Sequence, residues 1–293
     1  MFVALAAIWG ASFLFMRIAA PYFGVWWTAE LRVALATLAM AGVAFGTGRA
    51  MLTRRHWRGF LVVGTFNSAI PFALYAYAAL HLPTGYSAIL NALTPLWGAL
   101  FAAWMLGERL TLRVVAGVAL ALAGVSLLVK VGVGALDAHA LAAVAACLAA
   151  TACYGFAGAY TKKALSGVAS FATATNSQLF AALVLLPMAA VRLPTVNPPL
   201  QAWWAMLLLA LLCSAVAYFL YFALIARLGP TKATTVTFVV PAFGMLWGWL
   251  LLGEPVTLAM LLGFALVLAA TALVMGFGPF AARAVAAPDS SAR

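Results

Sequence analysis

The sequence predicts an all-α integral membrane protein in which ten transmembrane helices form two five-helix repeats of inverted topology. Three observations lead to this fold class. First, 67% of the 293 residues are hydrophobic and only 7% are charged, whereas a soluble domain carries about 25% charged residues. Second, apolar stretches of about 20 residues, long enough to cross a bilayer, recur along the whole chain. Third, the second half of the chain repeats the first.

The apolar stretches are separated by short breaks that hold most of the charges, prolines and glycines. None alternates for long enough to form a barrel strand, and only helices and closed barrels satisfy their backbone groups in lipid. We therefore expect a helical bundle. The ten expected spans cover about residues 2–20, 27–46, 58–80, 85–106, 111–130, 140–161, 171–191, 203–226, 231–252 and 257–277.

The net charge of +11 is explained by topology and does not indicate a nucleic-acid surface. If the N-terminus is cytoplasmic, twelve basic residues lie inside: Arg49, Arg54, Arg55, Arg58, Arg109, Arg113, Lys162, Lys163, Arg227, Lys232, Arg283 and Arg293. Only Arg17, Lys130 and Arg192 then lie outside. This excess follows the positive-inside rule, so we predict that both termini are cytoplasmic.

The repeat is clearest where PLWGALFAAWMLGERLT, starting at Pro95, returns as PAFGMLWGWLLLGEPVT, starting at Pro241. At this offset of 146 residues, 17 of the 57 positions in 73–129 match those in 219–275. Nearer the N-terminus the offset becomes 145, which aligns Trp9-Gly10 with Tyr154-Gly155 and Arg17 with Lys162. So long an internal match indicates a true repeat.

Each repeat contains five expected spans, and an odd number inverts the second repeat in the membrane. In this architecture the substrate site lies near the midplane between the repeats. We predict repeats at 1–134 and 135–280 and a cytoplasmic tail at 281–293.

Both repeats carry Leu-Gly-Glu at a hairpin between two spans. Gly107 and Gly253 are suited to stop a helix, and Glu108 and Glu254 to cap backbone amides near a helix start. We interpret these residues as structural.

The chain resembles the EamA branch of the drug/metabolite transporter superfamily over nearly its whole length. The matching residues are Trp9-Gly10, Ser12-Phe13, Arg32, Pro95, Leu106-Gly107-Glu108, Thr111, Gly117, Pro241, Leu252-Gly253-Glu254, Thr257 and Gly263. The resemblance implies a ten-helix carrier that exports amino acids, metabolites or drugs across the bacterial inner membrane.

Bacterial aromatic-amino-acid exporters are similar, which favours an amino-acid substrate, aromatic or otherwise neutral. An exporter of cationic drugs and a channel for small solutes remain alternatives. The expected partners are a small molecule and the lipid bilayer, a monomer is plausible, and the coupling ion stays open.

The expected substrate site is a stripe of polar, small and proline residues on paired helices. Residues three or four apart share a helix face, and in helices four and nine this stripe includes Asn91, Pro95, Thr237 and Pro241. Helices three and eight add Asn67, Pro71, Tyr75, Tyr218 and Tyr221. The three prolines are expected helix bends. A tight packing seam is the alternative reading of the stripe.

Two pairs of aromatic residues and one intramembrane charge complete the candidates. Trp9 pairs with Tyr154 in the repeat, and Trp97 pairs with Phe243. Arg32 lies inside the second span, where a charge is a functional candidate by default. It could meet a substrate carboxylate or tie helix two to a neighbour, and Gln178 is its uncharged counterpart.

Nothing in the sequence indicates an enzyme, a metal site or a cofactor. His56, His81 and His139 lie in or near loops, far apart in sequence, and no H-E-x-x-H or paired-aspartate pattern occurs. The three cysteines fall within apolar spans and are expected to pack there.

Overall fold

The computed structural model describes residues 1–48, 54–132, 137–194, 196–229 and 233–276. These residues form helices joined by short connections, without a strand among them. Eight helical segments are long and apolar enough to cross a membrane: Phe2–Gly46, Trp57–His81, Thr84–Leu106, Leu112–Val129, Ala138–Ala164, Ser170–Val191, Leu200–Leu228 and Leu258–Met275. Val236–Leu252 is a shorter apolar helix. The expected all-helical class is therefore confirmed for the described part of the chain.

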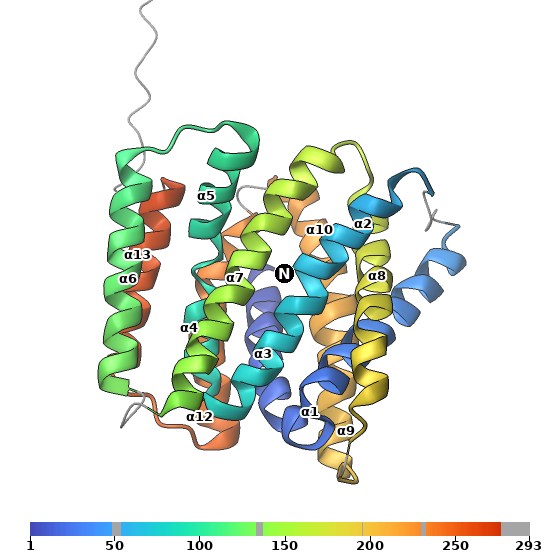
Figure 1. The fold of residues 1–293 in the computed structure, drawn as a ribbon, viewed down its shortest axis with the longest axis horizontal. Coiled ribbons are helices and arrows are strands. Elements are labelled where there is room, and N and C mark those ends of the chain that lie inside the picture. The colour runs from blue at the N-terminus through green and yellow to red at the C-terminus, as the bar shows by residue number, and fades with distance from the viewer. Residues whose placement is uncertain (49–53, 133–136, 195, 230–232, 277–293) are drawn as a thin grey trace, which may run out of the picture.

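The first helix, α1 (Phe2–Gly46), contains a sharp bend at Gly24. Its 45 residues would extend about 68 Å if straight, more than twice the hydrocarbon thickness. Gly24 has φ 70° and ψ 174°, a backbone conformation that glycine adopts without a steric penalty. The two arms of α1 diverge from this point (Figure 1). One continuous element thus holds the first two expected spans.

Two equivalent spans contain a π-helical segment. In the first repeat it covers Thr65–Ala69, between α2 (Trp57–Gly64) and α3 (Ile70–His81). In the second repeat, Leu208–Val216 lies between α9 (Leu200–Leu207) and α10 (Ala217–Leu228). Pro71 lies in the first turn of α3. Such π segments are frequent at functional sites, and here they precede the cavity residues of α3 and α10.

The fourth and ninth expected spans differ in their continuity. The chain turns at Ala92 and Leu93 between α4 (Thr84–Asn91) and α5 (Thr94–Leu106), and Pro95 lies in the first turn of α5. Its counterpart, α12 (Val236–Leu252), continues through Pro241. The two repeats therefore differ in shape at equivalent positions.

The remaining long helices are α6 (Leu112–Gly132), α7 (Ala138–Ala164), α8 (Ser170–Val191) and α13 (Leu258–Met275). The equivalent helices α6 and α13 pack along each other at one edge of the bundle, on the left in Figure 1. In the centre α1 packs against α12 and α7 packs against α5. These central contacts join the two repeats.

The central helices approach each other closely at two glycines. A Cβ added to Gly10 would lie 2.7 Å from the Cβ of Phe243, and one added to Gly155 would lie 2.6 Å from that of Trp97. These four residues are related by the sequence repeat, so each repeat contributes the glycine to one contact and the aromatic residue to the other. The same close contact is therefore made twice, crosswise between the repeats.

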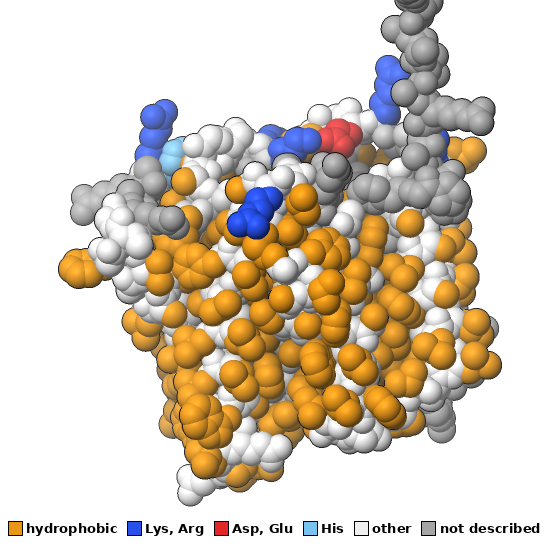
Figure 2. Space-filling view, turned by 180° about the vertical axis from the view of Figure 1, so that it is seen from behind, with side chains coloured by type: hydrophobic (Ala, Val, Ile, Leu, Met, Phe, Trp, Pro, Cys, Tyr) orange, Lys and Arg blue, Asp and Glu red, His pale blue; other side chains and the backbone are white. Residues whose placement is uncertain are grey.

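Charged side chains gather at one end of the face in Figure 2, and the rest of that face is apolar or uncharged. The start of α2 and the α5–α6 and α7–α8 connections lie at the upper end in Figure 1. This end carries the exposed Arg58, Arg109 and Lys162. Arg49, Lys232, Arg283, Arg293 and the predicted tail 281–293 lie outside the described residues.

Replacing Gly155 by alanine should destabilise the protein by about 1–3 kcal/mol, because the added methyl group meets the Trp97 backbone. Gly158→Ala is the matched control on the same helix, since a Cβ there meets nothing within 4 Å. Thermal unfolding in detergent, followed by tryptophan fluorescence, measures both. Equal midpoints for the two variants would contradict the close crossing.

Candidate functional site

A cavity of about 650 Å³ lies among α1, α3, α5, α7, α10 and α12. Volumes of this size accommodate small organic ligands. Most of the sequence-predicted residues line it: Trp9, Arg32, Asn67, Tyr75, Asn91, Pro95, Tyr154, Tyr218, Tyr221 and Thr237. They come from helices of both repeats.

One wall of the cavity is a hydrogen-bonded polar group in the first repeat. The Tyr75 hydroxyl donates to Asn91 Oδ1 over 3.0 Å. The Thr94 hydroxyl donates to the Asn91 carbonyl over 2.8 Å, across the turn between α4 and α5. The Tyr154 ring lies 6.2 Å from the Tyr75 ring, nearly parallel to it. This wall offers amide and hydroxyl groups beside an aromatic surface.

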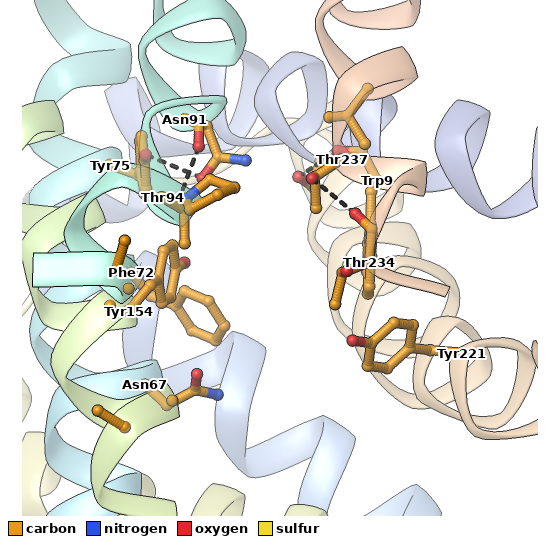
Figure 3. Close-up of a pocket in the computed structure, with 18 of the residues that line it drawn as sticks. Trp9, Asn67, Phe72, Tyr75, Asn91, Thr94, Tyr154, Tyr221, Thr234 and Thr237 are labelled. Carbon is orange, nitrogen blue, oxygen red and sulfur yellow. Dashed lines mark hydrogen bonds between the residues drawn. The ribbon is translucent and has the colours of Figure 1, made fainter. Parts of the chain in front are cut away.

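The opposite wall is mainly aromatic. Trp9 and Tyr221 lie with ring centroids 5.2 Å apart, and the Thr237 hydroxyl donates to the Thr234 carbonyl over 2.8 Å. Figure 3 shows these four residues across an open space from Tyr75, Asn91 and Thr94. The two walls are therefore similar in chemistry but not identical.

A polar cluster adjoins the cavity at Tyr218. Its hydroxyl accepts a hydrogen bond from Gln178 Nε2 at 3.2 Å and a longer one from Asn67 Nδ2 at 3.5 Å. Asn67 and Tyr218 line the cavity, while Gln178 is fully buried behind them. Gln178 thus contacts a cavity residue and does not reach the cavity itself.

Arg32 brings a buried positive charge to the cavity. Its side chain is only 6% exposed. Nε donates to Ser214 Oγ over 3.0 Å, Nη1 lies 3.7 Å from Met16 Sδ, and the guanidinium sits 3.7 Å above the centre of the Phe72 ring. The described residues offer no carboxylate within ion-pair distance of Arg32. Its own contacts are therefore neutral.

The sequence did not single out the neutral residues that hold Arg32. Ser214, Met16 and Phe72 all line the cavity. Ser214 is adjacent to Cys213, which is the counterpart of Asn67. This adjacency was the only sequence signal that pointed to Ser214. Methionine and phenylalanine on an apolar helix give no signal at all, because they are the usual residues of helix packing.

Four of the other predicted residues pack between helices. Trp97 and Phe243 contact the crossing glycines, and Pro71 and Pro241 are buried in their helices. None of these four lines the cavity. The positions of Pro71 and Pro241 agree with the packing alternative for the stripe, and the aromatic pair Trp97 and Phe243 lies outside the cavity lining.

Glu30 is a second buried charged residue of α1, two positions before Arg32. It is 6% exposed, and its Oε2 has no hydrogen-bond partner among the described residues. It does not line the cavity. An intramembrane acid of this kind is a candidate for proton coupling by its position alone.

The cavity extends to one end of the bundle. Leu106, Glu108, Lys162 and Met275 line it there, at the upper end of Figure 1. Among the described residues, no group of three or more histidines, cysteines or acids could hold a metal ion. The arrangement offers a ligand hydrogen-bonding groups, aromatic surfaces and one buried guanidinium group.

Residues 1–130 and residues 141–276 each match the EamA-like transporter family. The chain belongs to this family. This EamA-like protein is therefore a multi-pass membrane protein of a transporter family, as the resemblance implied. The family assignment indicates transport of a small molecule across a bilayer and not enzymatic catalysis.

Three relatives and one solved structure extend this result. A "probable terminal-alkyne amino-acid exporter" of Streptantibioticus cattleyicolor is 26% identical, over 91% of this chain and 89% of the relative. "Uncharacterized transporter YoaV" of Bacillus subtilis is 18% identical (90% and 92% covered), and an uncharacterized transporter of Archaeoglobus fulgidus is 21% identical (89% and 92%). A crystal structure at 17% identity shares the fold, with TM-score 0.65 over 93% of this chain and 94% of that chain.

Cysteines placed in the cavity should react with a membrane-impermeant maleimide added from the Glu108 side. Asn91→Cys and Thr237→Cys are the test positions, in a protein whose native cysteines are serine. Ile89→Cys and Val236→Cys are matched controls. Ile89 and Val236 are close in sequence to the test positions, and their own side chains are fully buried. Test and control positions that react at equal rates would contradict the cavity described here.

Proposed function

We propose that this EamA-like protein is a secondary carrier of the bacterial inner membrane that exports amino acids, aromatic or otherwise neutral, or related small metabolites. It would act as a monomer by alternating access, with the cavity exposed to one side of the membrane at a time. Ten spans in two inverted repeats, 1–134 and 135–280, would surround this cavity, and both termini would be cytoplasmic.

The crosswise contacts support the inverted-repeat architecture. Gly10 meets Phe243 and Gly155 meets Trp97, which is the reciprocity that a two-fold axis between the repeats produces. The bend at Gly24 separates two spans within α1. The two arms of α1, the other seven long segments and the shorter α12 would make up the ten proposed spans. Carriers built in this way bind substrate near the midplane and rock one repeat against the other.

The orientation rests on the positive charges. Arg58, Arg109 and Lys162 lie at the end of the bundle to which the cavity extends. By the positive-inside rule, this end would be cytoplasmic. The structure would then represent the state that takes up substrate from the cytoplasm, as an exporter requires.

The contacts of Arg32 are the main reason to propose a substrate with a carboxylate group. Burying a charge without a partner is unfavourable, yet this guanidinium has only neutral contacts among the described residues. Guanidinium groups form strong, often bidentate hydrogen bonds with carboxylates. A substrate carboxylate would supply the missing anion, and an amino acid brings one.

The aromatic walls suit the apolar part of such a substrate. Trp9, Tyr154 and Tyr221 offer ring surfaces, which bind apolar groups through buried area and stacking. The hydroxyl and amide groups at Asn91 could meet the ammonium group. The name of the Streptantibioticus cattleyicolor relative, an amino-acid exporter, agrees with this substrate class.

Two other functions fit less well. A cationic drug would place a second positive charge in a cavity that already holds Arg32. A channel would need a path through both ends, whereas Arg17 and Glu254 form an ion pair at the end opposite Glu108. A carrier for a carboxylate-bearing substrate is therefore the better fit.

Counterflow in proteoliposomes tests the proposed function. The panel contains phenylalanine, tryptophan, leucine, a terminal-alkyne amino acid, phenylalanine amide and a quaternary ammonium drug, with and without a pH gradient. We expect saturable, stereoselective exchange of the amino acids and little exchange of the amide. Exchange of the drug alone would establish the cationic alternative, and non-saturating flux would establish a channel.

Replacing Arg32 by glutamine should weaken amino-acid transport at least tenfold in kcat/KM, because the charge-assisted hydrogen bonds to the carboxylate are lost. The same variant should discriminate less between phenylalanine and its amide, which a purely structural role of Arg32 would not produce. Arg113→Gln is the control, since Arg113 is exposed at a helix start. Unchanged discrimination in Arg32→Gln would contradict the assignment.

A further inference from the structure

Two ion pairs connect the repeats at opposite ends of the bundle. Arg17 Nε lies 3.7 Å from Glu254 Oε1, and Lys162 Nζ lies 2.8 Å from Glu108 Oε1. In each pair the base and the acid come from different repeats. The α12–α13 connection, which holds Glu254, is at the lower end of Figure 1, and the α5–α6 connection, which holds Glu108, is at the upper end.

The sequence repeat relates the two pairs to each other. Arg17 corresponds to Lys162 at the offset of 145 residues, and Glu108 corresponds to Glu254 at the offset of 146. Each pair therefore joins the first helix of one repeat to the Leu-Gly-Glu hairpin of the other. The chain makes one type of contact twice, once near each membrane surface.

The Arg17–Glu254 pair is tightly held. The Glu254 carboxylate also accepts hydrogen bonds from the Thr84 amide at 2.8 Å and from the Thr84 hydroxyl at 3.3 Å. It thereby caps the start of α4 in the other repeat, and its side chain is only 15% exposed. The carboxylate lies against Gly248, where an added Cβ would collide with it.

The Lys162–Glu108 pair is loosely held by comparison. Its side chains are 69% and 51% exposed. In the sequence repeat, Ala102 of the first repeat corresponds to Gly248 of the second, and Pro230 of the second repeat corresponds to Thr84 of the first. Alanine places a methyl group where the carboxylate would rest, and proline has no amide hydrogen to donate. By sequence, therefore, neither Gly248 nor the Thr84 amide donor has an equivalent residue in the Glu108 pair.

The cavity distinguishes the two ends in the same way. Glu108 and Lys162 line it, whereas Arg17 and Glu254 do not. The structure is therefore open toward the Lys162–Glu108 pair and closed at the less exposed Arg17–Glu254 pair. An exposed ion pair contributes little to stability, so the Lys162–Glu108 pair does not by itself keep its end shut.

We propose that the two pairs are opposing latches of the transport cycle, a device that rests on the proposed carrier function. Arg17–Glu254 holds its end closed in the state described here. When the cavity faces the other way, this pair separates and Lys162–Glu108 becomes the buried pair that closes the opposite end. Because the latches are unequal, the state open at the Glu108 end is the favoured resting state.

Two-sided labelling of Thr237→Cys tests the latches, in a reconstituted protein whose native cysteines are serine. The observable is the ratio of impermeant-maleimide labelling from the Glu108 side to that from the opposite side. Glu254→Gln should lower this ratio about fivefold or more, and Glu108→Gln should raise it about twofold. Glutamine can still accept the Thr84 amide hydrogen, so Glu254→Gln removes the charge while keeping the cap.

Matched variants guard against a folding defect. Arg17→Gln should act like Glu254→Gln, and Lys162→Gln like Glu108→Gln, because each removes the other member of the same pair. The double variant Glu108→Gln with Glu254→Gln should give an intermediate ratio. Thermal unfolding midpoints in detergent identify any variant that is misfolded. The labelling ratio is then taken from the variant that changes the other member of the same ion pair.

The outcomes separate the latches from the carrier function. Suppose that substrate changes the labelling ratio of the parent protein, but the Glu254 and Glu108 variants shift the ratio equally or not at all. The latch proposal is then rejected, while the proposed carrier function is retained. If the parent protein is labelled from one side only, with or without substrate, both proposals are overturned. Opposite shifts in the two variants support the latches.

Discussion

The close crossing of the central helices is the constraint on which the rest of the structure depends. Lipid gives little hydrophobic drive for helices to associate, so they depend on tight packing at small residues. Gly10 and Gly155 leave no room for a Cβ against Phe243 and Trp97. Each glycine directly follows a cavity aromatic, Trp9 or Tyr154, so the crossings also hold the rings that line the cavity. Helix packing and cavity geometry are thus set at the same points.

The electrostatics of the cavity follow from how few charges this membrane domain contains. Arg32 is buried with a hydroxyl, a thioether and an aromatic ring as its contacts. These neighbours keep the guanidinium in place without neutralising it, which leaves its charge available to a ligand. At the surfaces, acids and bases instead pair across the repeats. Among the described residues, the cavity charge thus has neutral contacts, while the charges at the two ends of the bundle are paired.

Much of this arrangement could be predicted from the sequence, because lipid requires helices and because a repeat aligns equivalent positions. Helix periodicity placed Asn91, Tyr75 and Thr237 on faces that the structure does turn toward the cavity. It could not place Trp97, whose backbone and Cβ lie at the α5–α7 crossing while Pro95 and Gly98 of the same helix line the cavity. Nor could it show that Glu254 reaches Thr84, 170 residues away, since a hairpin acid carries no signal about a distant partner.

The central claim is that one cavity between two inverted repeats opens to each side of the membrane in turn. Double electron–electron resonance, which measures the distance between two spin labels, tests it directly with one pair of labelled cysteines near each end. Arg109→Cys with Lys163→Cys reports on the end at which the cavity is open, and His81→Cys with Val256→Cys reports on the other. On adding substrate, the first distance should shorten while the second lengthens. Two distances that stay fixed, or that change in the same direction, would contradict alternating opening of the cavity.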